Sequence, residues 1–234
     1  MKIDLIAFDA DDTLWENEAL YQKAQAKLRT ILSPWRPPQV IDKVLYETEM
    51  SNMPIYGYGI KAFSLSMIET ALKVSNGGIS GNDITAIIAI THSMLEAEIQ
   101  LHPHVEATLA SLSLDYPLMI ITKGDLLDQT QKINRSGLAK FFRMTEIIND
   151  KTPEAYQAIL EKHNLVPEHF LMIGNSLRSD ILPVLALGGS AVHIPANTTW
   201  AHETVNEFDP RIDRFYELEH MGQLLDLISK NFMG

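Results

Sequence analysis

The sequence predicts an α/β fold: a doubly wound parallel sheet with one inserted segment that is entirely helical. A short, mostly apolar run at residues 3–8 is typical of a strand buried on both faces of such a sheet. From about residue 105, apolar runs of strand length alternate with stretches of helical spacing, as in parallel α/β sheets. Between these two regions the apolar residues recur only at helical spacing. We therefore expect a core domain at residues 1–14 and 102–234 and an all-helical domain at residues 15–101.

Four helices are expected in the inserted segment. The proline-rich residues 33–38 end the first, because proline interrupts a helix, and Asn76-Gly77-Gly78 separates the last two. Residues 51–59 contain one proline and two glycines and are predicted to form a loop. The expected helices cover residues 20–32, a short stretch from about 39, residues 63–72 and residues 84–99.

The core elements follow from the same periodicities. Thr152 and Pro153 are a typical N-cap and first helical residue, and Gly137 suits the end of the preceding helix. Beyond about residue 195 the pattern predicts only a terminal helix. The expected strands are residues 118–121, 146–148, 170–173 and 190–194, and the expected helices are residues 105–113, a stretch ending near 136, one from 153, one after 180, and 221–232.

Composition excludes several classes of function. The chain has 234 residues, of which 46% are hydrophobic, so it can bury a core without disulfides or a structural metal. It contains no cysteine, which excludes thiol catalysis and cysteine-ligated zinc. A net charge of −11 argues against nucleic-acid binding. No apolar run has the length of a membrane helix, and the amino terminus lacks a secretory signal pattern. We expect a cytoplasmic protein with no membrane partner.

Polar side chains follow four of the predicted strands. Because ligands bind at the carboxyl ends of parallel strands, these side chains should converge on one pocket. The pocket would combine carboxylates, a hydroxyl, an ammonium group and oxygen ligands for a hard cation, a set that suits phosphoryl transfer. The residues concerned are Asp9, Asp11 and Asp12 after the first strand, Thr122 and Lys123 after the second, Asp150 and Lys151 after the third, and Asn175 and Asp180 after the fourth.

This constellation resembles the haloacid dehalogenase (HAD) superfamily. The matching residues, in chain order, are Asp9-x-Asp11-x-Thr13, Thr122, Lys151 and Gly174-Asn175-Ser176-x-x-x-Asp180. The helical insertion just after the first motif is similar to the C1-type cap of the superfamily, and the resemblance extends from residue 3 to about residue 194. It implies a Rossmann-like core and a phosphatase-type hydrolase.

The resemblance also implies a role for each motif residue. Asp9 would be the nucleophile that forms an aspartyl-phosphate. Asp11 would protonate the leaving oxygen and then act as base for the hydrolytic water. Thr122 would donate a hydrogen bond to a phosphoryl oxygen, and Lys151 would neutralise both nucleophile and phosphoryl group. Magnesium would be bound by Asp9, the main-chain carbonyl of Asp11 and the fourth motif, through Asn175, Asp180 or both.

Two positions depart from the family pattern, and one separates two chemistries within it. Asp12 stands where many family phosphatases have glycine, and we interpret it as structural. Asn175 stands where aspartate is common, and an uncharged amide predicts weaker magnesium binding. The dehalogenases of the superfamily have a non-acidic residue at the position of Asp11 and use no metal. A carboxylate there indicates a phosphatase, since an oxygen leaving group needs a proton and a halide does not.

Further residues are candidates for substrate binding. Tyr56 and Tyr58 lie in the expected cap, which supplies specificity in this superfamily, although ordinary packing is the alternative. Trp15 could line the cleft between cap and core or simply pack against the cap. Lys123 and Gly124 follow the second strand and either contact substrate or fix the loop.

The resulting prediction is a magnesium-dependent phosphatase that hydrolyses a small soluble phosphate monoester through an aspartyl-phosphate. Two alternatives stay open: a phosphomutase on the same scaffold, and a non-catalytic protein that binds a phosphorylated ligand. The mutase would keep all four motifs and differ in how long the aspartyl-phosphate survives water. Asn175 is the residue that supports the non-catalytic alternative.

Overall fold

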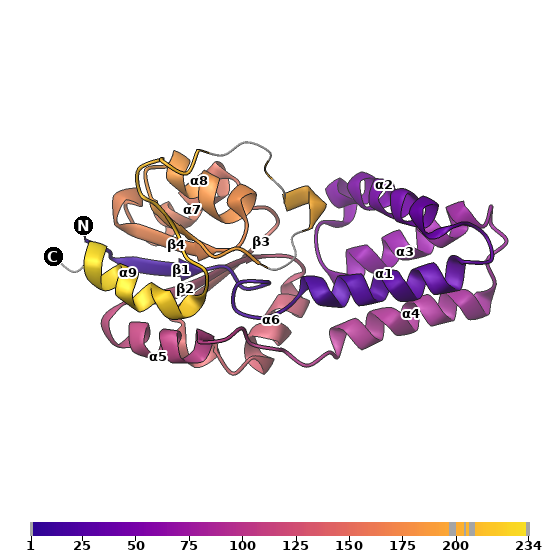
Figure 1. The fold of residues 1–234 in the computed structure, drawn as a ribbon, viewed down its shortest axis with the longest axis horizontal. Helices are drawn as coiled ribbons and strands as arrows, with labels where there is room; N and C mark the ends of the chain where they lie inside the picture. Colours follow the sequence, from indigo (N-terminus) through magenta and orange to yellow (C-terminus); the bar gives the residue numbers. More distant parts are fainter. Residues whose placement is uncertain (1, 197–199, 204, 206–208, 233–234) are drawn as a thin grey trace. The chain divides into compact units, whose positions relative to one another are not determined.

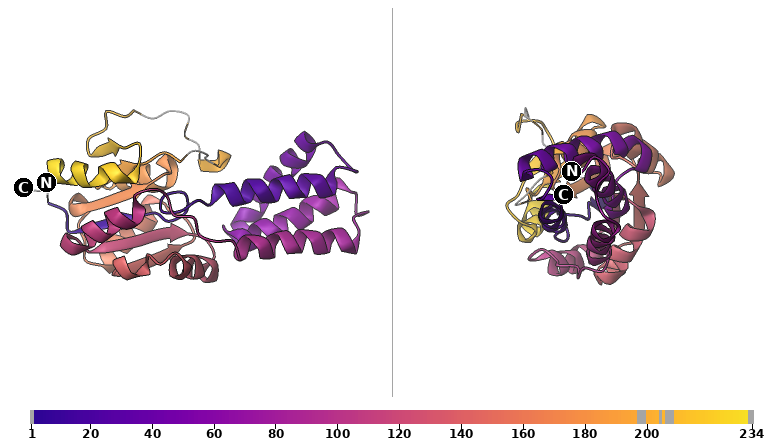
Figure 2. Two further views of the ribbon diagram at one scale, coloured as in Figure 1. Left: turned by 60° about the horizontal axis from the view of Figure 1, so that its bottom comes forward. Right: turned by 90° about the vertical axis from the view of Figure 1, so that its right-hand side faces the viewer.

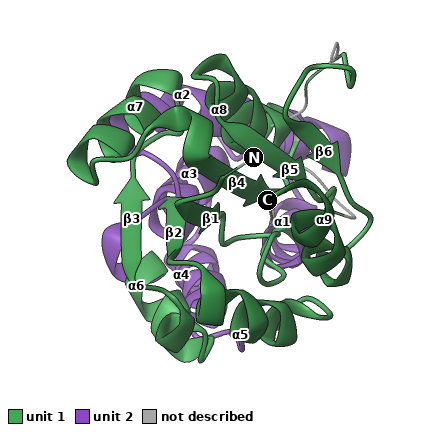
Figure 3. Cartoon of the chain, turned by 90° about the vertical axis from the view of Figure 1, so that its left-hand side faces the viewer, with its two compact units in different colours: residues 1–18, 99–123, 129–234 green, residues 19–98, 124–128 purple. Residues whose placement is uncertain are grey.

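The computed structural model describes residues 2–196, 200–203, 205 and 209–232. Over these residues the chain divides into two compact units (Figure 3). The core unit comprises residues 1–18, 99–123 and 129–234, and the helical unit comprises residues 19–98 and 124–128. None of the helices in these described ranges is long and apolar enough to cross a membrane.

The core unit is built on one parallel sheet. In the described ranges it has six strands in the order β3-β2-β1-β4-β5-β6, with β1 in its interior (Figure 3). Phe8, the last residue of β1, is opposite Ile120 of β2 and Ile173 of β4, and β2 continues to Lys123 beyond this level. This register brings the last two residues of β2, Thr122 and Lys123, to the same edge of the sheet as the polar residues that follow β1 and β4. The strands are β1 (Leu5–Phe8), β2 (Leu118–Lys123), β3 (Met144–Ile148), β4 (Phe170–Gly174), β5 (Ser190–His193) and β6 (Phe215–Glu217).

Both faces of the sheet are covered by helices (Figure 1). Ile6 and Phe8 of β1 face an apolar cluster with α5 and α9, while Leu5 and Ala7 face the cluster with α7 and α8. Alternate residues of one strand are thus buried on opposite sides, which confirms the predicted doubly wound sheet. The helices are α5 (Val105–Asp115), α6 (Leu126–Arg135), α7 (Pro153–Lys162), α8 (Leu182–Ala186) and α9 (Leu224–Asn231), and the shorter turns are η1 (Ala139–Phe141), η2 (Pro167–His169), η3 (Leu177–Ile181), η4 (Ala201–Glu203) and η5 (Met221–Gln223).

The helices of the helical unit lie side by side around an apolar core of their own (Figure 2). Leu28, Leu45, Met67 and Ile87 come from four successive helices and are all buried in this core. Ser80 begins the last of them with a reciprocal capping box to Asp83, which satisfies two otherwise free backbone donors. The helices are α1 (Glu18–Leu32), α2 (Pro38–Tyr56), α3 (Ile60–Val74) and α4 (Gly81–Leu95).

The structure corrects two local predictions and confirms one. The predicted loop at 51–59 is wrong over its first part, because α2 continues to Tyr56 with Pro54 inside it. Pro54 lies in the last turn, where its missing N–H removes a single hydrogen bond. Gly57, with a positive φ of 71°, caps the helix just after its last residue. Strand β6 was not predicted, because it has three residues and none of them is buried. Thr152 is confirmed as the N-cap of α7, since its side chain accepts from the Ala155 N–H.

Candidate active site

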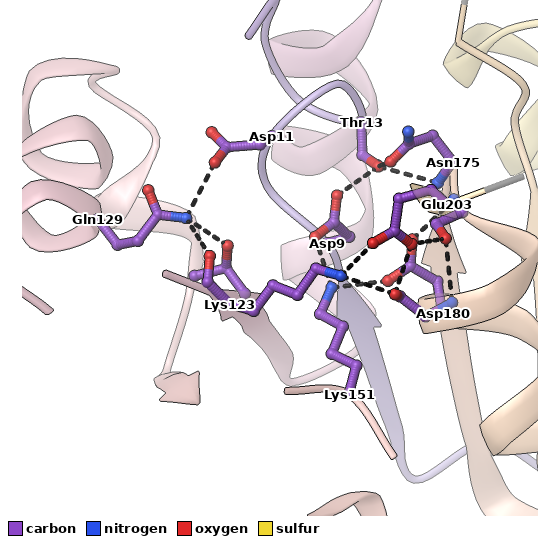
Figure 4. A network of polar contacts seen from close by, with 12 residues as sticks. Asp9, Asp11, Thr13, Lys123, Gln129, Lys151, Asn175, Asp180 and Glu203 are labelled. Carbon is purple, nitrogen blue, oxygen red and sulfur yellow. Dashed lines mark hydrogen bonds and ion pairs between the residues drawn. The ribbon is translucent and has the colours of Figure 1, made fainter. Parts of the chain in front are cut away.

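Three charged side chains meet in the interior of the core unit, at the carboxyl edge of the sheet (Figure 4). The Lys151 Nζ lies 2.5 Å from Asp9 Oδ1 and 2.6 Å from Asp180 Oδ1. Burial by itself disfavours the ammonium, but the carboxylates of Asp180 and Asp9 outweigh burial and raise the pKa of Lys151. Lys151 is therefore held as a cation. Because two buried carboxylates share this single ammonium, one negative charge is left over, and burial raises the pKa of Asp9 to about 7 against the opposing Lys151.

The other oxygen of Asp9 lies in a small group of polar atoms. Thr13 Oγ1 donates to Asp9 Oδ2 at 2.8 Å and accepts from the Asn175 N–H at 3.1 Å. One polar atom of the Asn175 side-chain amide is 3.3 Å from both Asp9 Oδ2 and the carbonyl oxygen of Asp11. With its NH₂ group turned this way, the amide donates to these oxygens. With its oxygen turned this way, the amide presents an oxygen 3.3 Å from each of these two oxygens.

These three oxygens fit a hard divalent cation. Adjacent ligands of an octahedral magnesium ion lie ~3 Å apart, since each is about 2.1 Å from the metal. The observed 3.3 Å separations are close to that spacing. Both oxygens of Asp180 are already engaged, by Lys151 and by the Ser176 N–H at 2.9 Å. In the described ranges no three His, Asp or Glu side chains are grouped to hold a metal, so the candidate set relies on an amide and a main-chain carbonyl.

Asp11 lies beside this group and is held by donors from two directions. Trp15 Nε1 donates to Asp11 Oδ1 at 2.7 Å, and Lys132 Nζ is 2.7 Å from both carboxylate oxygens. Gln129 Nε2 donates to Asp11 Oδ2 at 3.0 Å and to Thr122 Oγ1 at 2.6 Å. Gln129 and Lys132 are three residues apart on α6, so they project from the same face of that helix. The helix begins at a side-chain cap, in which the Asp128 N–H donates to Asp125 Oδ1.

A fourth carboxylate completes the network. Glu203, on η4, accepts from Ser176 Oγ at 2.5 Å and Ser179 Oγ at 2.6 Å, and it forms an ion pair with Lys123 Nζ. Burial opposes the charged form of Glu203. The ammonium of Lys123 and the hydrogen bonds from Lys123, Ser176 and Ser179 outweigh burial and lower the pKa of Glu203 to about 2. The Ser176 side chain holds Glu203 while its main-chain N–H holds Asp180.

The family of the chain follows from comparison with known proteins. A model of the haloacid dehalogenase-like hydrolases matches residues 3–188. The chain belongs to this hydrolase family. A glyceraldehyde 3-phosphate phosphatase from Methanothermobacter thermautotrophicus is 24% identical in an alignment of 236 positions that covers 95% of this chain and 98% of that protein.

Solved structures show the same fold. A haloacid dehalogenase-like family hydrolase from Xanthomonas campestris is 36% identical, with a TM-score of 0.87 over 97% of this chain and 91% of that chain. The HAD-hydrolase YfnB from Bacillus subtilis, bound to magnesium, is 18% identical, with a TM-score of 0.68 over 97% of this chain and 99% of that chain. Solved 2-haloacid dehalogenases share the fold as well, at 21% identity or less.

Asp12, where many HAD phosphatases have glycine, has a structural role in this hydrolase. Its φ is 61°, in the left-handed region that glycine adopts freely and that aspartate tolerates better than most residues. Its carboxylate accepts the N–H groups of Asn17 at 2.9 Å and Glu18 at 2.9 Å, at the start of α1. The extra carboxylate is thus used as a helix cap.

The residues predicted to contact substrate are distributed between the two units. Trp15 is buried and its indole supports Asp11, and Lys123 pairs with Glu203 within the core unit. Gly124, Tyr56 and Tyr58 belong to the helical unit, where Tyr56 is exposed at the end of α2 and Tyr58 is half-buried.

The sequence reasoning missed Gln129, Lys132 and Glu203. The first two carried a usable signal, because they follow the second motif at helical spacing and are polar residues on the buried face of a short helix. Glu203 carried none, since it lies in a long connection between β5 and β6 with no motif around it.

Proposed function

We propose that this hydrolase is a magnesium-dependent phosphatase that hydrolyses a small phosphate monoester through an aspartyl-phosphate. The observation that carries the proposal is the carboxylate of Asp11, fixed by three donors beside the buried pair of Asp9 and Lys151. A carboxylate at this place can move protons to and from oxygen, which ester hydrolysis requires. The phosphatase from Methanothermobacter is a distant relative that supports the same reaction class.

The first half-reaction forms the covalent intermediate. A carboxylate oxygen of Asp9 attacks phosphorus, and the bond between phosphorus and the leaving oxygen breaks. Asp11 in its protonated form gives its proton to that oxygen, so the product leaves as an alcohol. Lys151, which is held as a cation, offsets the repulsion between the nucleophile and the anionic ester. Thr122 donates its hydroxyl hydrogen to a phosphoryl oxygen.

The second half-reaction releases phosphate. A water molecule attacks phosphorus, and the bond to the Asp9 oxygen breaks, which regenerates the carboxylate. Asp11, now ionised, accepts a proton from this water as the bond forms. Trp15 and Lys132 hold the Asp11 carboxylate in place for both transfers.

The residues that would hold magnesium are Asp9 through Oδ2, Asp11 through its carbonyl and Asn175 through its amide oxygen. When bound, the cation would neutralise the excess negative charge and polarise the phosphoryl oxygens. We propose that Asp180 acts mainly by holding Lys151, because both of its oxygens are engaged. Lys123, Gly124, Tyr56 and Tyr58 remain proposed substrate contacts, and Trp15 is proposed to act through Asp11.

The experiment measures inorganic phosphate released from a panel of small esters that includes glyceraldehyde 3-phosphate, with and without magnesium. Asp9→Asn is the matched control, because an amide of the same size is not a competent nucleophile. We expect magnesium-dependent release that the variant lacks. Halide release from 2-chloropropionate is measured in parallel. Release of halide without release of phosphate would overturn the proposal in favour of a dehalogenase, and release that survives in Asp9→Asn would remove the nucleophile assignment.

A further inference from the structure

Gln129 connects two groups that the proposed reaction uses separately. Its side-chain nitrogen lies 3.0 Å from Asp11 Oδ2, 2.6 Å from Thr122 Oγ1 and 3.0 Å from the carbonyl oxygen of Lys123 (Figure 4). Only 2% of the residue is exposed. The NH₂ group has two hydrogens for these three acceptors, and it links the side chains of Asp11 and Thr122 when one hydrogen is directed to each of them.

The bond to Thr122 fixes the direction of a hydroxyl. Within the described part of the chain, Thr122 Oγ1 accepts from Gln129 and donates to no residue. Its hydrogen is therefore left to point away from Gln129, where a phosphoryl oxygen can accept it. The same amide supplies a donor to Asp11 Oδ2, the carboxylate oxygen that Trp15 does not contact. Gln129 thereby orients an acceptor and a donor at once.

The other end of the amide is unfavourable for stability. Gln129 Oε1 is buried and has no hydrogen-bond partner among the described residues. Leaving a buried acceptor unpaired opposes folding, so the side chain carries a penalty at its oxygen beside the hydrogen bonds that its nitrogen makes. Such groups in folded proteins are often tied to function. The presence of glutamine at this position is thus better explained by the contacts of its nitrogen with Asp11 and Thr122 than by a contribution to stability.

We propose that Gln129 is a positioning residue that aligns the proton-transferring carboxylate of Asp11 with the phosphoryl-binding hydroxyl of Thr122. The inference rests on the proposed phosphatase function. It predicts a defect that depends on the leaving group. An alkyl ester needs a proton on its departing oxygen, whereas nitrophenolate leaves readily without one. Misplacing Asp11 should therefore slow alkyl esters more than p-nitrophenyl phosphate.

The test compares kcat for glycerol phosphate and for p-nitrophenyl phosphate in the wild type, Gln129→Met and Gln129→Glu. For Gln129→Met we expect about a 100-fold loss on the alkyl ester and less than about a 10-fold loss on the aryl ester, the scale of a displaced catalytic group. The melting temperature of Gln129→Met is measured as well, to establish that the variant is folded, because the change removes the hydrogen bonds of the NH₂ group together with the unpaired oxygen. Gln129→Glu should also weaken inhibition by inorganic phosphate more than Gln129→Met does, since a carboxylate would take the Thr122 hydrogen.

Gln131→Met is the matched control, because Gln131 is exposed on the same helix. It should leave both rates unchanged. Equal losses on the two esters, or no loss in Gln129→Met, would each overturn the positioning role. A wild-type protein that releases phosphate from neither ester would instead overturn the proposed function on which the inference rests.

Discussion

Replacing Glu203 by glutamine should destabilise the protein by an amount that depends on pH. The glutamate is only 11% exposed and is held by Lys123 and two serine hydroxyls. Its pKa falls from the ordinary 4.5 to about 2 in the folded protein. Each unit of difference corresponds to about 1.4 kcal/mol, so the charged form contributes about 3 kcal/mol at neutral pH. Breaking a buried ion pair by removing one partner has a similar effect, about 3–5 kcal/mol.

The direction of the pH dependence follows from the sign of the shift. Because the folded pKa lies below the unfolded one, the stabilisation is fully present above pH 4.5 and is lost as the pH falls towards 2. The difference in unfolding free energy between wild type and Glu203→Gln should be about 3 kcal/mol at pH 7 and about 2 kcal/mol at pH 3.5.

Urea unfolding of both proteins across this pH range measures the difference directly. Glu219→Gln is the control, because that side chain is exposed, and its effect should be below about 0.5 kcal/mol at every pH. A Glu203→Gln protein whose unfolding free energy lies within about 1 kcal/mol of the wild-type value at pH 7 would refute the stabilising role of the contacts that Glu203 makes with Lys123 and the two serines. So would a difference that grows as the pH falls.

Three further predictions concern the site and its scaffold. Asn175→Asp adds a charge to the candidate metal group, so the magnesium concentration for half-maximal phosphate release should fall; an unchanged value would show that Asn175 is not a ligand. Lys151→Met leaves Asp9 and Asp180 facing each other without their shared cation, so kcat should drop by at least about 100-fold, and full activity would contradict its electrostatic role. Thr152→Ala removes the α7 cap and should lower the unfolding free energy by about 1 kcal/mol in urea titrations with kcat unchanged, whereas an unaltered stability would show that the cap contributes nothing.

The fold and the order of the motifs could be predicted because both depend on local sequence. A strand buried on two faces needs an apolar residue at every position, and residues 5–8 of β1 show this directly. The polar residues after β1, β2 and β4 could be grouped without coordinates, since parallel strands end at the same edge. Local patterns were less informative where packing against neighbouring elements decides the secondary structure. Pro54 inside α2 and the three-residue strand β6 are the two examples.

The sequence by itself determined that this protein has a doubly wound sheet, a helical insertion and the four motifs of a HAD hydrolase. Only the tertiary structure decided how the charges are shared. It showed that one ammonium, Lys151, serves two carboxylates, and that Gln129 spans Asp11 and Thr122. It also brought Glu203 to Lys123 across 80 residues of chain. Periodicity and motif spacing predict which residues lie on one face of a helix or strand. Hydrogen bonds between elements depend on distances of a few tenths of an ångström, which only the packed fold sets.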